Sequence, residues 1–137
     1  MVPTLNLTGK SGSSLNLEFS AAVGPGLQWT TLDFVVLSQG SQLYFDVSAP
    51  LPPQRFYRVS QTMPAGITPA LSCRFVPALT LSGNIGDSVR VDYINAKGPT
   101  DAWWTLDTIT LTNTSQLYFD TSSIGQPRRL YRLVTVP

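Results

Sequence analysis

The sequence predicts an all-β protein that contains two copies of one antiparallel module. Residues 3–59 overlay residues 77–133 without a gap, and about 25 of the 57 paired positions are identical. The segment SQLYFD occurs in both copies, as residues 41–46 and 115–120. Apolar residues alternate with polar ones in the repeated segments, which is the period of half-buried strands. Charged residues make up only 12% of the chain whereas turn-forming residues are abundant, a composition typical of compact β proteins.

Each copy is expected to contain five strands and almost no helix. Alternating apolar residues predict strands at residues 5–7 and 15–19, and the glycines between them predict a hairpin that pairs these two strands. A third strand is expected at residues 29–37, a fourth in the SQLYFD segment and a fifth at residues 55–59. The two copies would form either paired β-sandwiches or one continuous sandwich with pseudo-twofold symmetry. The expected strands of the second copy are residues 79–81, 89–93, 103–111, 115–120 and 129–134.

The repeat divides the chain into a first module at residues 1–60, a connector at residues 61–76 and a second module at residues 77–137. The second half of the connector, residues 70–76, is apolar enough to pack against a neighbour instead of serving as a flexible tether. The single cysteine, Cys73, lies in this segment, so a disulfide within the chain is excluded.

Composition argues against several classes of function. The net charge is +1 and the arginines do not form a basic stripe, so neither a nucleic acid nor an anionic membrane surface is the expected partner. The chain has no histidine, which excludes Ser-His-Asp and Cys-His catalysis and argues against a zinc site. A pair of carboxylates of the kind that hydrolyses glycosides remains open. Because Asp33 and Asp46 recur as Asp107 and Asp120, we expect a structural role for them and no enzymatic activity.

The repeated ions predict a pinned loop in each copy. Asp46 follows a strand, and Arg55 and Arg58 come one short loop later, so an ion pair or an aspartate bonded to loop amides would hold that loop. Asp120 with Arg129 or Arg132 would do the same in the second copy. A structural calcium ion is the alternative for these aspartates, although no EF-hand spacing supports it, and we expect no metal or other cofactor.

Among the aromatic residues, Trp104 is the best functional lead. Trp29 and Trp103 share one module position, which favours packing, whereas the first copy has Thr30 where the second has Trp104. Adjacent strand residues point to opposite faces unless a bulge intervenes, so one of the two adjacent indoles is expected to reach a second surface. An exposed indole can stack on a sugar ring or cap an interface between modules.

Two matched sets of residues recur in the two copies: Trp29, Leu32, Phe45, Asp46, Arg55, Tyr57 and Arg58, and Trp103, Leu106, Phe119, Asp120, Arg129, Tyr131 and Arg132. This pattern resembles modules that end many large secreted proteins of environmental bacteria. These modules are small fibronectin-type or immunoglobulin-like β-sandwiches, and the resemblance implies an extracellular or cell-surface setting without a settled activity. Met1 and Val2 align with the residues directly before the second copy and no signal peptide opens the sequence, so we expect a part excised from a larger secreted protein.

Two hypotheses about function result from these patterns. The first is a non-catalytic polysaccharide-binding module with an exposed aromatic platform. The second is a structural or adhesive tandem spacer, in which the same aromatics bury the seam between the two copies. Its partners would be neighbouring modules of a larger parent protein. The residues expected to bind a polysaccharide are Trp104 or Trp103, helped by Tyr118 or Tyr44 and by the loop residues Asn95, Lys97 and Asp101.

Overall fold

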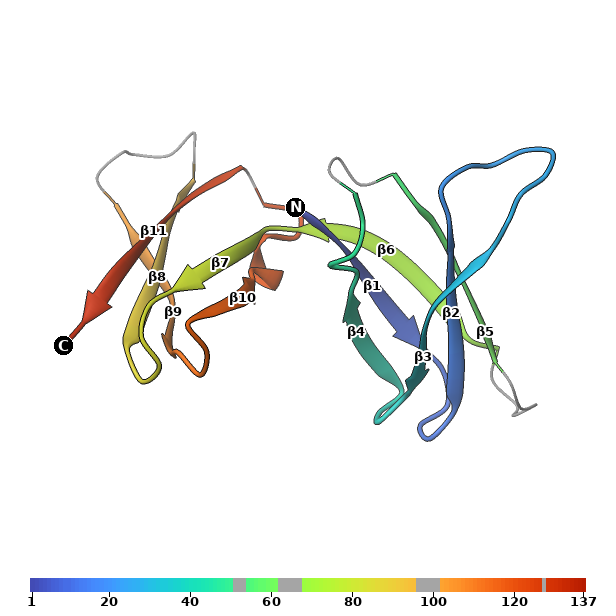
Figure 1. Cartoon of the computed structure of the whole chain (residues 1–137), viewed down its shortest axis with the longest axis horizontal. Coiled ribbons are helices and arrows are strands. Elements are labelled where there is room, and N and C mark those ends of the chain that lie inside the picture. Colours follow the sequence, from blue (N-terminus) through green and yellow to red (C-terminus); the bar gives the residue numbers. More distant parts are fainter. Residues whose placement is uncertain (51–53, 62–67, 96–101, 127) are drawn as a thin grey trace. The chain divides into compact units, whose positions relative to one another are not determined.

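The chain is all-β, as the sequence predicts, and its sheets are antiparallel. The computed structural model describes residues 1–50, 54–61, 68–95, 102–126 and 128–137. These fold into two compact units, unit 1 (Met1–Phe75) and unit 2 (Val76–Pro137), shown in Figure 1. The helix in the described ranges is a single 3₁₀ turn, η1 (Thr121–Ser123).

In the described residues each unit has two sheets. In unit 1 the strand orders are β4-β1-β6 and β3-β2-β5, and in unit 2 they are β10-β7 and β11-β8-β9. The strands of unit 1 are β1 (Val2–Thr8), β2 (Ser14–Ser20), β3 (Thr30–Val36), β4 (Ser41–Phe45), β5 (Phe56–Gln61) and β6 (Ala70–Val76). Those of unit 2 are β7 (Ala78–Ser82), β8 (Ser88–Asn95), β9 (Trp104–Thr110), β10 (Ser115–Phe119) and β11 (Arg129–Val136).

The predicted hairpin between the first two strands of each copy is wrong. β1 pairs with β4 and β2 pairs with β3 and β5, so β1 and β2 belong to different sheets. In unit 2 the corresponding strands β7 and β8 are separated in the same way. The glycines between the strands do make a turn, with Gly12 at φ +80° and Gly86 at φ +94°, but the turn carries the chain from one sheet to the other.

Burial explains why the two strands separate. Leu5 and Leu7 of β1 and Leu15 and Leu17 of β2 are fully buried and belong to one apolar cluster. If β1 and β2 were paired as neighbours, all four side chains would line one face of one sheet and would still need a cover. In separate sheets they cover each other, and each buried leucine contributes about 1.5 to 3 kcal/mol to folding.

Both units have a core drawn from both of their sheets. The cluster of unit 1 adds Val35 and Leu37 to the four leucines, and that of unit 2 contains Leu81, Val89, Val91 and Leu111. These cores fix the ends of β4 and β10 opposite the starts of β5 and β11, where the repeated charged residues lie.

The expected connector is not a separate element along its whole length. Its residues 70–76 form β6, which is hydrogen-bonded to β1 and runs back along it (Figure 1). Leu71 of β6 packs against the core of unit 1. The boundary between the compact units therefore falls at Phe75, and most of β6 belongs to unit 1.

Candidate functional site

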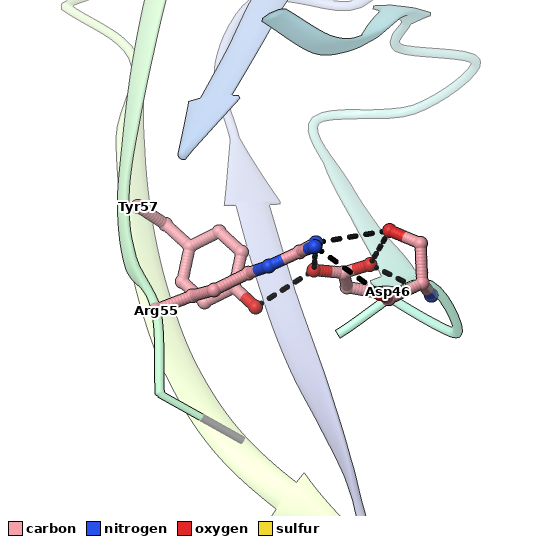
Figure 2. Close-up of polar contacts among 4 residues, drawn as sticks. Asp46, Arg55 and Tyr57 are labelled. Atoms are coloured by element: carbon pink, nitrogen blue, oxygen red, sulfur yellow. Dashed lines mark hydrogen bonds and ion pairs between the residues drawn. The ribbon is translucent and has the colours of Figure 1, made fainter. Parts of the chain in front are cut away.

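The side chain of Asp46 lies at the centre of the polar cluster in unit 1. Asp46 follows β4 and is 2% exposed. Its Oδ2 atom lies 2.7 Å from Arg55 Nη1 and accepts a hydrogen bond of 2.8 Å from the Tyr57 hydroxyl (Figure 2). Its Oδ1 atom accepts hydrogen bonds from the backbone N–H and the hydroxyl of Ser48, at 3.0 and 2.7 Å. The carboxylate thus links the end of β4 in one sheet to the strand of Tyr57, β5, in the other.

Unit 2 repeats this cluster around Asp120. Asp120 Oδ2 lies 2.7 Å from Arg129 Nη1 and accepts a 2.7 Å hydrogen bond from the Tyr131 hydroxyl. Asp120 Oδ1 accepts from the N–H and hydroxyl of Ser122 at 3.0 and 2.7 Å, and so caps the 3₁₀ turn η1. The second copy therefore uses the same four side chains in the same roles.

Burial and hydrogen bonding act in opposite directions on these carboxylates. Burial alone would raise the pKa of Asp46, but the hydrogen bonds from Ser48, Tyr57 and Arg55 outweigh it and hold the pKa below its ordinary value. Asp120 has its pKa lowered by the matching donors in unit 2. Burial and the neighbouring carboxylate raise the pKa of Tyr57, so its hydroxyl stays protonated and donating.

Each arginine of these clusters also covers an aromatic ring. The guanidinium carbon of Arg55 lies 3.9 Å from the ring centre of Phe19, and that of Arg129 lies 3.9 Å from the ring centre of Tyr93. The arginine is therefore enclosed between a carboxylate and a ring, a favourable setting for a guanidinium that has lost water. We call the cluster of Asp46, Ser48, Arg55, Tyr57 and Phe19, and its equivalent in unit 2, the clamp.

The other two repeated arginines pair with different acids. Arg58 Nε lies 2.7 Å from Glu18 Oε2, and its guanidinium carbon lies 4.4 Å from the ring centre of Trp29. In unit 2, Arg132 Nε lies 2.9 Å from Asp92 Oδ2 and its guanidinium carbon 4.5 Å from the Trp103 ring centre.

Asp92 is a third buried aspartate, and the sequence analysis did not predict its ion pairs. It is 1% exposed, and it accepts hydrogen bonds from Arg90, Arg132 and Thr105. The hydrogen bond from Arg90 is the main cause that lowers its pKa, against the opposing effect of burial. Glu18 and Asp92 occupy equivalent positions but are different residue types, so a search for identical residues in the two copies does not find them. Comparing charge at equivalent positions would have found the pair.

The two adjacent tryptophans, Trp103 and Trp104, differ in the exposure of their side chains. Trp103 is half-buried beneath Arg132, whereas Trp104 is 62% exposed on the edge strand β9, opposite Tyr93 in the register of β8. A register irregularity between Val91 and Asp92 lies beside this point.

The remaining residues expected to bind a polysaccharide do not join Trp104 in one platform. Tyr118 is half-buried and packs against the core of unit 2. Asn95 ends β8 opposite Arg129, and its buried Oδ1 atom has no hydrogen-bond partner among the described residues. Tyr44 packs against the core of unit 1. Lys97 and Asp101 lie outside the described residues.

In unit 1, a shallow hollow of about 310 Å³ lies beside Thr30, the residue equivalent to Trp104. Phe19 and Thr30 line it together with residues 20–28 of the following loop, and these two residues are cross-strand partners. Their equivalents in unit 2 are Tyr93 and Trp104. The exposed indole thus occupies the position at which unit 1 has a threonine in the wall of a hollow.

No family model, curated protein or solved structure matches the chain. The resemblance to secreted bacterial modules therefore stays a prediction. In the ranges that the structure describes, no three acidic, cysteine or histidine side chains gather in a way that could hold a metal ion. Over the same residues, no helix has the length and apolar character needed to cross a membrane.

Proposed function

We propose that the chain is a non-catalytic structural module in tandem, part of a larger secreted or cell-surface protein, and that each copy is a small β-sandwich. The observation that carries this proposal is the clamp, because the charged residues that recur in both copies make the same contacts within their own unit. Asp46 with Arg55 and Asp120 with Arg129 have the same separation of 2.7 Å.

The contacts within the clamp are suited to stabilising the unit and not to catalysing a reaction. The four donors to Asp46 occupy both oxygens of its carboxylate, and a lowered pKa keeps it from delivering a proton near neutral pH. Arg55 is equally engaged, since it also donates to the backbone carbonyl of Ser48 at 3.1 Å. A bond that joins two sheets of one unit resists their separation. A module that spaces or anchors other domains needs this property.

Single-molecule stretching of the native chain tests this role. We expect two unfolding events, one for unit 1 (Met1–Phe75), which releases about 25 nm of chain, and one for unit 2 (Val76–Pro137), which releases about 20 nm. Asp46→Asn should lower the force of one event and Asp120→Asn that of the other. The control Glu18→Gln, which breaks an ion pair between two strands of one sheet, should lower neither. Unfolding without a resolvable force, or equal forces in the clamp variants and the native chain, would reject the structural role.

A second candidate function, polysaccharide binding, is favoured by the exposure of Trp104. The 62% exposed indole is not required by the module, because the equivalent residue in unit 1 is Thr30. A flat exposed ring is suited to stacking on a pyranose. With Trp103 beneath Arg132 and Tyr118 against the core, this would be a contact made by one indole, and Lys97 and Asp101 remain the expected polar partners.

Affinity electrophoresis against a panel of soluble polysaccharides, with pull-down on insoluble ones, tests this candidate. Trp104→Ala should abolish retention by the preferred polysaccharide. The matched control is Phe34→Ala, which removes an aromatic ring of similar exposure, 67%, from β3 of unit 1 and should leave retention unchanged. If no polysaccharide distinguishes Trp104→Ala from the native chain, the binding candidate is rejected and the structural role stands alone.

A further inference from the structure

The two copies differ at one sheet edge. In unit 1, β1 lies between β4 and β6, whereas in unit 2 the equivalent strand β7 is hydrogen-bonded to β10 alone among the described strands. The sequences of the two strands are closely similar, PTLNLT in residues 3–8 and PALTLS in residues 77–82. Among the described residues, one copy of this edge is thus occupied by a strand and the other is open.

The backbone of β7 presents bonding groups along the open edge. The Asp120 N–H donates to the Pro77 carbonyl, and the Gly83 N–H donates to the Thr114 carbonyl. In an antiparallel pair the residues that bond to one neighbour alternate with those that face away. The odd-numbered residues of β7 therefore bond to β10, and the N–H and C=O groups of Ala78, Thr80 and Ser82 point to the open edge. In β1 the same alternation directs Thr4, Asn6 and Thr8 toward β6.

The side chains of β1 and β7 also differ in burial between the two units. Leu5 is fully buried and Thr4 is 2% exposed, but their equivalents Leu79 and Ala78 are only half-buried. In unit 1 the strand β6 supplies Leu71, which packs against the core. The described part of unit 2 has no strand in the place of β6 that could supply such a side chain.

We propose that the open edge of β7 is a docking site for an extended strand with the sequence character of Ala70–Val76, which adds to β7 as β6 adds to β1. The occupant is identified by the occupied copy of the edge: a strand that fits β1 meets nearly the same residues on β7. Its main-chain groups would bond to Ala78, Thr80 and Ser82, and the leucine equivalent to Leu71 would pack against the core of unit 2 as Leu71 packs against that of unit 1. The inference rests on the proposed tandem role, since such a strand would fasten the next segment of the parent protein onto the copy before it.

A variant with an added strand tests the inference. Pro137 is equivalent to Met63, so a second copy of residues 64–76 appended after Pro137 stands in the same register to unit 2 as the original does to unit 1. Amide hydrogen exchange of Ala78, Thr80 and Ser82 is the readout. We expect exchange at these three amides to slow at least about tenfold, because strand addition converts exposed donors into bonded ones.

The matched control is the same extension with Leu71→Asp in the appended copy, which keeps its length but places a charge on the core. Slowing with the native extension and not with the control supports the site. Equal exchange with both extensions and with the native chain overturns the inference. Slowing in the unextended chain that grows with protein concentration would assign the edge to a second copy of this chain and would also overturn it.

A peptide of residues 69–76 with Cys73→Ser, added to the native chain, gives the same readout if the extended chain does not fold. Failure of this inference is separable from failure of the structural role, because the stretching experiment uses the unextended chain and reads the clamp.

Discussion

Leu5 and Leu79 occupy equivalent positions in the two units, yet Leu5 is fully buried and Leu79 is not. Their own strands do not explain the difference, since β1 and β7 have nearly the same sequence and pair with β4 and β10 in the same register pattern. We expect β6 to contribute to the difference, because it is hydrogen-bonded to β1 and lies in the connector and not in the repeat. Among the described residues, the two equivalent strands thus differ in their neighbours at one edge and in the burial of one repeated leucine.

The clamp shows the opposite behaviour. The bond from Tyr57 to Asp46 is 2.8 Å and that from Tyr131 to Asp120 is 2.7 Å. All side chains of the clamp lie within the repeat, so the geometry is reproduced in both units. The polar contacts are a property of the repeat, and the packing at the sheet edge is a property of its surroundings.

The largest expected effect concerns the clamp. Asp120→Asn and Asp46→Asn each leave a mostly buried arginine without its carboxylate, and the free energy of unfolding of the affected unit should fall by about 3 to 5 kcal/mol. The loss should be larger for Asp120, because the Arg129 side chain is 7% exposed and that of Arg55 is 12%. Urea unfolding followed by tryptophan fluorescence measures it.

Ser122→Ala is the control for this comparison. It removes a hydroxyl donor to Asp120 without stranding a charge, and it should cost about 1 kcal/mol. If Asp120→Asn costs no more than Ser122→Ala, the ion pair is not what stabilises unit 2.

Truncating equivalent leucine side chains of β1 and β7 tests the difference between the two strands. Leu5→Ala opens a cavity at a fully buried position and should cost about 3 kcal/mol. Leu79→Ala removes a half-buried side chain and should cost clearly less, as judged by the unfolding of each unit. Equal losses would mean that β6 does not account for the burial of Leu5.

Acid should weaken both units together. The pKa values of Asp46 and Asp120 are lowered in the folded state from the ordinary 3.8, so the unfolded chain binds protons first as the pH falls. Their contribution is complete above the ordinary pKa and is lost as the pH falls through the folded-state values. Urea midpoints measured from pH 7 to pH 2 should drop below pH 4, with a shallower drop in a chain carrying Asp46→Asn and Asp120→Asn.

The all-β class was predictable from the sequence because the period of two and the repeat are local signals. The hairpin was not, because alternation identifies a strand with one buried face but does not say which strand lies beside it. Leu5 and Leu15 are equally apolar whether they are neighbours in a sheet or face each other across a core. The pairing of β1 with β4 depends on the whole unit.

The candidate site was predictable where the residues are identical in both copies. Asp46 and Arg55 stand out in the repeat, whereas the pairing of Arg132 with Asp92 required knowing which residues face each other on β8 and β11. The sequence could not show which of Trp103 and Trp104 is exposed, because alternation along a strand does not assign side chains to faces where the register shifts.

The smallest expected effect separates these adjacent tryptophans. Trp104 is 62% exposed, so Trp104→Ala should change the free energy of unfolding of unit 2 by no more than about 0.5 kcal/mol. Trp103→Ala removes a half-buried ring under Arg132 and should cost about 2 kcal/mol, as should Trp29→Ala in unit 1, where Arg58 covers the ring. Urea unfolding of the three variants provides the comparison. A loss for Trp104→Ala equal to that for Trp103→Ala would place the Trp104 indole in the packing of unit 2 and leave no surface aromatic on β9 for a sugar or a neighbouring module.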